Sequence, residues 1–145
     1  LAASRAALEA GDAAVAESSA REAVRLDDGA ADGWFALGRA LEAAGRHGEA
    51  RAAYLGAKDR DALRFRAPEA MNELLRELAA AHGAALVDSQ RALASQSRHR
   101  IIGGELMLEH LHPNLRGYFL LADAFYGPLA EALEAPVRVP RETAW

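Results

Sequence analysis

The sequence predicts a mainly α-helical chain in which helical hairpins are followed by a partial α/β segment with one or two strands. Three observations lead to this prediction. Residues 1–60 keep a helical pattern throughout and contain an internal repeat of about 34 residues. A short apolar run at 84–87 follows an amphipathic helix, as a buried strand does in an α/β unit. A second amphipathic stretch begins near residue 114.

The composition excludes several classes of protein. Of the 145 residues, 51% are hydrophobic, so the chain can form a core. The formal net charge is −4 and the basic residues are interspersed, which argues against nucleic acid as a partner, because neutralising phosphates requires clustered Lys and Arg. The chain has no cysteine, which excludes disulfides and thiolate metal ligands. We expect no cofactor.

The ends of the chain also carry information. No apolar run reaches the ~18 residues that a membrane span requires, and no signal-peptide pattern is visible. The compartment stays open, and these two features favour the cytoplasm. The chain begins at Leu1 in what resembles the middle of a helix. We therefore expect a fragment of a longer protein.

The second repeat copy, residues 31–61, is the clearer one. Its regularly spaced positions are Trp34, Leu37, Gly38, Leu41, Gly45, Ala50, Tyr54 and Ala57. The equivalent positions of the first copy are Gly11, Ala16, Ala20 and Ala23. Small residues such as Gly38 and Ala50 allow two antiparallel helices to approach closely, while larger side chains fill the groove between them. Gly11 and Gly45 are each expected to end a helix.

This spacing resembles the tetratricopeptide repeat (TPR) over roughly the first 60 residues. The resemblance implies a surface that binds a protein or peptide partner. A generic helical hairpin is the alternative. Fewer than two full repeats leave an apolar face uncovered, so we expect another part of the protein to cap them.

The pattern changes after residue 61. Pro68 stands in the first turn of an expected helix that ends at Gly83, and its apolar side holds Met71, Leu74, Leu75 and Leu78. The run Ala84–Val87 then predicts a buried strand. One strand leaves backbone groups unpaired, so it requires partners. We expect these from an upstream part of the same protein or from another chain, because only Arg100–Ile102 offers a second candidate strand.

The remaining elements are a short helix over 89–94, a loop, and a long helix from Asn114 through Phe125 with Phe119, Leu120, Leu121 and Phe125 on its buried side. Gly127-Pro128 is expected to break it before a short helix to Glu134. The predicted domains are therefore 1–61 (repeats), 62–134 (α/β segment) and 135–145 (an extended tail).

The stretch LEHLHPNLRGY, residues 108–118, contains the candidate site. His112 lies just before the expected N-cap Asn114, and the positive end of that helix favours the neutral imidazole that a general base requires. Glu109 lies three residues earlier and can reach a ring nitrogen, which would set the tautomer and stabilise the imidazolium. The alternative for His112 is a helix-entry histidine bonded to a loop carbonyl. His110 is expected to pack or to face solvent, and its i, i+2 spacing from His112 argues against a shared metal.

The order of Glu109, His112, Pro113 and Asn114, followed by Gly117-Tyr118, resembles the C-terminal block of the SGNH (GDSL-like) hydrolases, and the wider resemblance spans residues 62–134. It implies hydrolysis of esters or acetyl groups by acyl transfer, with His112 as general base and Glu109 as its orienting acid. Glutamate stands where that family has aspartate.

The same resemblance leaves the site incomplete. The nucleophilic Gly-Asp-Ser motif and the family's oxyanion-hole Gly and Asn are absent, and the nearest match, Gly11-Asp12-Ala13, lacks the serine. We expect the chain alone to be inactive. The alternative function is a noncatalytic TPR module for protein–protein interaction that keeps a degenerate hydrolase remnant.

Overall fold

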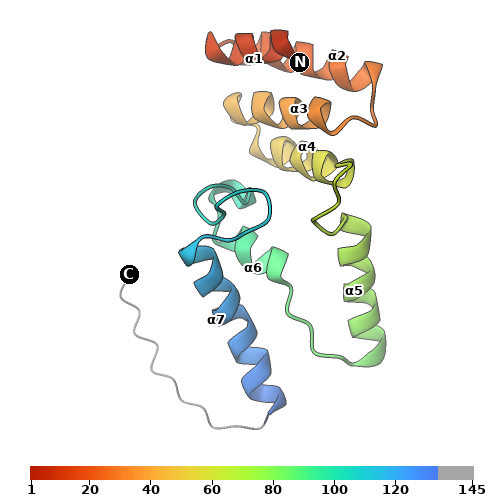
Figure 1. Ribbon diagram of the computed structural model, residues 1–145, viewed down its shortest axis with the longest axis vertical. Helices are drawn as coiled ribbons and strands as arrows, with labels where there is room; N and C mark the ends of the chain where they lie inside the picture. Colours follow the sequence, from red (N-terminus) through yellow and green to blue (C-terminus); the bar gives the residue numbers. More distant parts are fainter. Residues whose placement is uncertain (134–145) are drawn as a thin grey trace. The chain divides into compact units, whose positions relative to one another are not determined.

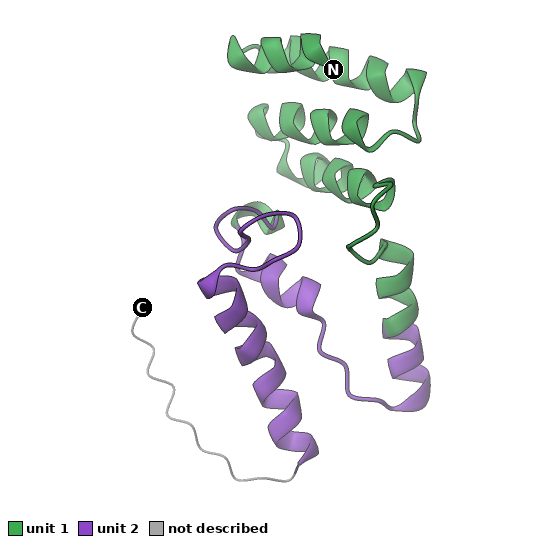
Figure 2. Cartoon of the chain, in the orientation of Figure 1, with its two compact units in different colours: residues 1–75, 98–101 green, residues 76–97, 102–145 purple. Residues whose placement is uncertain are grey.

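The computed structural model describes residues 1–133 and is mainly helical (Figure 1), which confirms the predicted mainly α class. The described residues form seven α-helices and one 3-10 turn, and no strand occurs among them. The chain folds as two compact units (Figure 2). Unit 1 holds Leu1–Leu75 and Arg98–Ile101, and unit 2 holds Arg76–Ser97 and, within the described part, residues 102–133.

Unit 1 is built on four helices that each pack on the next (Figure 1). They are α1 (Ala2–Glu9), α2 (Ala13–Leu26), α3 (Ala31–Ala43) and α4 (His47–Asp59). Gly11 and Gly45 follow α1 and α3 with φ of +77° and +74°, in the left-handed region that glycine adopts without strain. Asp12 caps α2, since its carboxylate accepts the Val15 N–H at 2.9 Å. The predicted helix ends therefore lie where the sequence placed them.

The core of unit 1 is formed by small and medium apolar side chains. Its main cluster of buried residues is Ala20, Leu37, Leu41, Ala50 and Ala53. Gly38 allows close contact between α3 and α4, because a Cβ at this position would lie 2.6 Å from the Tyr54 ring. The Tyr54 hydroxyl in turn donates to Glu42 at 2.7 Å. Close packing at glycine and alanine thus holds these helices together.

Helix α5 (Glu69–His82) begins directly after Pro68, whose carbonyl accepts the Met71 N–H at 3.0 Å, and Gly83 follows it with φ of +62°. No residue of α5 is buried. Its apolar side, Met71, Leu74, Leu75 and Leu78, is 45–53% exposed. The amphipathic pattern was therefore sufficient to predict the helix, but nothing in the described residues covers its apolar side.

The strand predicted over Ala84–Val87 is not formed in the described part of the chain. The segment runs as a connection from α5 to α6 (Ser89–Ser95). Among the described residues, the N–H groups of 85–87 have no backbone acceptor. The second candidate strand, Arg100–Ile102, is also not formed, because Arg100 belongs to the 3-10 turn η1 (Arg98–Arg100) with φ of +62°. A strand requires a neighbour to bond, and residues 1–133 offer none.

Helix α7 (Leu115–Ala132) begins at the predicted N-cap, Asn114, whose side chain accepts the Gly117 N–H at 3.0 Å. The break expected at Gly127-Pro128 is wrong, since α7 continues through Pro128. Pro128 has no N–H to donate to the carbonyl of Ala124, four residues earlier. Ala124 is only partly buried, so water can donate to that carbonyl instead. Glu134 and the predicted extended tail, 135–145, lie outside the described residues.

The apolar side chains of α7 are largely exposed, although the helix packs against α6. Phe119 is 55% and Phe125 is 50% exposed, so the prediction that they form a buried face is wrong. The only buried residue of α7 is Gly117. The described residues therefore leave much of the apolar surface of α7 uncovered.

Candidate functional site

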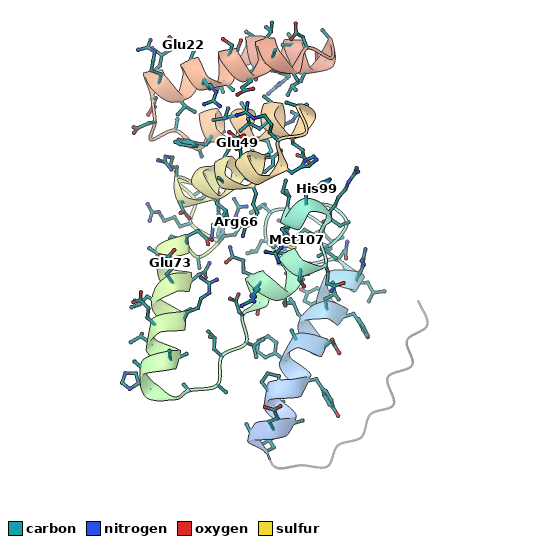
Figure 3. The ribbon with its side chains drawn as sticks, turned by 180° about the vertical axis from the view of Figure 1, so that it is seen from behind. Glu22, Glu49, Arg66, Glu73, His99 and Met107 are labelled. Atoms are coloured by element: carbon teal, nitrogen blue, oxygen red, sulfur yellow. The ribbon has the colours of Figure 1, made fainter. Side chains whose placement is uncertain are left out.

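The predicted acid and base lie on a closed turn of unit 2, residues 106–114, which contains Met107 (labelled in Figure 3). Met107 and Pro113 form an antiparallel bridge, and the Asn114 N–H donates to the Leu106 carbonyl at 2.9 Å. One step further into the turn, the Leu108 N–H donates to the His112 carbonyl at 2.8 Å. These two hydrogen bonds make 108–112 a small closed loop.

The base of this turn is held by close packing on the start of α7. Leu106 is completely buried. A Cβ at Gly117 would overlap the Leu106 carbonyl oxygen and lie 2.9 Å from Cβ of Pro113, so only glycine fits there without movement. The side chain of Asn114 also donates to the Gly104 carbonyl at 3.3 Å. The sequence identified Asn114 as a cap but gave no sign of the contact at Gly117.

The carboxylate of Glu109 is held at both oxygens by its own turn. Oε1 accepts the His112 backbone N–H at 2.9 Å and also contacts Nδ1 of the same residue. Oε2 accepts the Leu111 N–H at 2.9 Å and lies 2.8 Å from Nδ1 of His110. Glutamate is long enough to reach these backbone groups while it contacts an imidazole.

These donors determine the charge of Glu109. Desolvation favours the neutral acid, but donation by the His112 ring, the backbone N–H groups of His112 and Leu111, and the charge of His110 outweigh it and lower the pKa of Glu109 to about 2. Glu109 is therefore ionised at neutral pH. An ionised partner is the form that can stabilise an imidazolium.

The His112 ring faces Glu109 through Nδ1, which leaves Nε2 as the nitrogen that can exchange a proton with another group. Its side chain is 63% exposed. The hydrogen-bond partner of the ring is thus a carboxylate and not the loop carbonyl of the alternative interpretation. The structure brings Glu109 and His112 together, and their catalytic role stays a prediction.

His110 has a contact that the sequence did not reveal. Its side chain is 56% exposed, in line with a solvent-facing residue, yet Nδ1 also lies at Glu109. The i, i+2 argument placed the two histidines on opposite sides because it assumed an extended backbone, whereas 108–112 is a closed loop. Within residues 1–133, no group of three His, Asp or Glu side chains is arranged to bind a metal.

Unit 2 also contains an open groove of about 350 Å³ beside α6 and α7. Its lining residues are Leu86, Val87, Asp88, Arg91, Ala92, Ser95, Ala124 and Pro128. Ser95 is not prepared as a nucleophile, because its hydroxyl donates to the Ala92 carbonyl at 2.7 Å. Asp88 caps α6 by accepting the Arg91 N–H at 2.9 Å. Neither Glu109 nor His112 lines the groove, so it does not provide a substrate site for that pair.

A second histidine pair lies in unit 1. His47, the first residue of α4, stacks on His99 (labelled in Figure 3) with ring centroids 3.5 Å apart. His99 adopts a left-handed backbone with φ of +54°. Desolvation, then the charges of His47 and Arg98, lowers the pKa of His99. The stack joins positions far apart in the sequence, so local sequence patterns do not reveal it.

Comparison with known proteins adds no relative to this description: no family model matches the chain, and neither a curated protein nor a solved structure matches it. Within the described part of the chain, no helix has the length and apolar character needed to cross a bilayer.

Proposed function

We propose that this chain supplies the histidine base and its acid partner to an SGNH-like serine hydrolase that cleaves esters or acetyl groups by acyl transfer. The observation that supports the proposal is the contact between the Glu109 carboxylate and Nδ1 of His112 on a turn that leads into a helix capped by Asn114. Acid, histidine and cap stand in the order that the resemblance implies.

In the proposed reaction, Nε2 of His112 takes the proton of a serine hydroxyl as its oxygen attacks the ester carbonyl. Glu109 stabilises the resulting imidazolium through Nδ1. The imidazolium then returns the proton to the leaving alcohol, and an acyl-serine remains. A water molecule, deprotonated by the same Nε2, hydrolyses the acyl-serine and regenerates the free serine.

This chain has no recognisable motif for the nucleophilic serine or for the oxyanion hole, so the proposed reaction requires other residues to supply them. We propose that an upstream segment of the same protein, or another chain, supplies them together with the sheet that makes the segment α/β. Two observations support a missing layer: the apolar sides of α5 and α7 are exposed, and the N–H groups of 85–87 have no backbone acceptor among the described residues.

The second candidate function is a noncatalytic TPR-like module that binds a protein or peptide segment through unit 1. It is favoured by the fact that α1–α4 form their own buried core, which does not depend on unit 2. In this alternative the turn at 106–114 is a remnant. Both functions share the proposal of a protein partner, and they differ in whether His112 exchanges a proton.

Hydrolysis of p-nitrophenyl acetate by the product of the longer reading frame separates the two functions. We expect hydrolysis that falls by about a thousandfold or more in kcat in His112→Ala, because the loss of a triad histidine removes the general base. The matched control is His82→Ala, at an exposed position on α5, which should leave the rate unchanged. We expect no hydrolysis by the 145-residue chain itself.

Two outcomes would contradict the enzyme proposal and favour the module. One is a longer reading frame without a Gly-Asp-Ser motif after a strand. The other is an activity that survives His112→Ala.

A further inference from the structure

The carboxylate of Glu109 is contacted at its second oxygen by a residue that the proposed reaction does not use. Nδ1 of His110 lies 2.8 Å from Oε2, while His112 contacts Oε1. Two imidazole rings thus contact one carboxylate, and each ring does so through its own Nδ1.

The second contact matters because a carboxylate on a flexible side chain rotates easily. The last torsion of glutamate is broad and roughly two-fold, so it does not fix the plane of the carboxylate by itself. Donors at only one oxygen leave the group free to tilt about that contact. Here Oε2 also accepts the Leu111 N–H at 2.9 Å, and Nδ1 of His110 lies 2.8 Å from the same oxygen, which makes an ion pair when the ring is protonated.

We propose that His110 is a positioning residue, whose Nδ1–H holds Oε2 of Glu109 and so keeps Oε1 directed at His112. For its catalytic meaning this inference rests on the proposed function. His110 does not touch the reacting atoms in this arrangement. It acts through Glu109, whose orientation sets the tautomer and angle of the His112 ring.

The inference is tested on the chain itself by replacing His110 and following the Glu109 carboxyl carbon by NMR as the pH is lowered. His110→Asn keeps an amide N–H close to the position of Nδ1, whereas His110→Gln and His110→Leu do not. In the unchanged protein the carboxyl should titrate near the lowered pKa of about 2. His110→Leu should raise that midpoint by about half a pH unit, since exposed charged contacts are individually weak. His110→Asn, which keeps an N–H donor but not the charge of the imidazolium, should restore part of the shift, and His110→Gln should restore none.

The exchange rate of the Asn114 amide, whose hydrogen bond closes the turn, shows whether each variant keeps its fold. If His110→Leu opens the turn, the comparison of His110→Asn with His110→Gln tests the positioning role instead. Both replacements are polar, and only Asn places a donor at the Nδ1 position. A midpoint unchanged in His110→Leu, or equal in His110→Asn and His110→Gln, would overturn the inference.

The titration requires no substrate, so its result is independent of the proposed function. In the longer protein, His110→Leu should lower kcat for p-nitrophenyl acetate by about two- to fivefold with KM unchanged, and His110→Asn should restore it. A protein without esterase activity would refute the proposed function and leave the titration result standing. An active protein in which His110→Leu leaves the titration midpoint of Glu109 unchanged would refute the positioning role alone.

Discussion

Replacing Gly117 by alanine should loosen the turn that presents the candidate pair. A Cβ at Gly117 would overlap the Leu106 carbonyl oxygen and lie 2.9 Å from Cβ of Pro113, where ordinary contact begins at 3.4 Å. The start of α7 must therefore move away from Pro113 by at least 0.5 Å, the difference between these two values, and further from the carbonyl. Both neighbours belong to the turn's own backbone or to a proline, so neither can rotate aside.

The size of the effect follows from two opposing contributions. In an open helical position, alanine is more stable than glycine by about 0.5–1 kcal/mol. Overpacking at a tight contact costs about 1–3 kcal/mol. At Gly117 the second contribution should exceed the first, because the displaced carbonyl of Leu106 also accepts the Asn114 N–H. We expect a net destabilisation of the turn of about 1–2 kcal/mol.

Amide hydrogen exchange at Leu108 and Asn114, whose N–H groups close the turn, measures this loss directly. Exchange at both amides should accelerate about 5- to 30-fold in Gly117→Ala, the change equivalent to 1–2 kcal/mol. Gly127→Ala is the matched control on the same helix, because a Cβ there meets nothing within 4 Å, and it should leave exchange unchanged or slower. Equal exchange in the two variants would refute the packing argument.

Three further predictions concern pH and packing. Glu109 has a lowered pKa of about 2, so its ionisation stabilises the folded turn above the ordinary value of 4.5, and this contribution is lost as the pH falls from 4.5 through 2. In Glu109→Gln the protection factors of the turn's amides, which correct for the intrinsic pH dependence of exchange, should no longer fall over this range. A fall that persists would exclude Glu109 as its source. His99 has a pKa below the ordinary 6.5, so its contribution is present above that pH and lost below it. The protection factors of the amides of residues 98–101, which correct for the intrinsic pH dependence of exchange, should fall on acidification. They should fall less in His99→Asn, which tolerates the left-handed backbone. Gly38→Ala should destabilise unit 1 in urea by about 1–3 kcal/mol, since its Cβ would lie 2.6 Å from the Tyr54 ring; Gly48→Ala, with open space around it, should not.

The helices could be predicted from the sequence because their signals are local. Gly11 and Gly45 end helices by a backbone conformation that glycine favours, and Asn114 caps α7 through a bond within its own turn. The pairing of Glu109 with His112 was also predictable, since they stand three positions apart in the same turn. Each of these features depends on neighbours in the sequence alone.

The features that the sequence did not predict correctly depend on distant parts of the chain or on groups outside residues 1–133. An apolar run such as Ala84–Val87 becomes a strand only beside another strand, and none is present among the described residues. The close approach at Gly117 and the stack of His47 on His99 require knowledge of which segments meet. The break expected at Gly127-Pro128 does not occur, and the local pattern does not show that the Ala124 carbonyl left without a donor is accessible to water.

The most direct test of the central claim, that Glu109 and His112 act as one acid–base unit, is a double-mutant comparison in the proposed complete enzyme, this chain together with the part that supplies the serine. The measurement is kcat for p-nitrophenyl acetate in His112→Ala, Glu109→Gln and the double variant. Residues that act as a unit show strongly non-additive losses, so the double variant should be no slower than His112→Ala alone. Losses that multiply, or a rate unaffected by either change, would contradict the account.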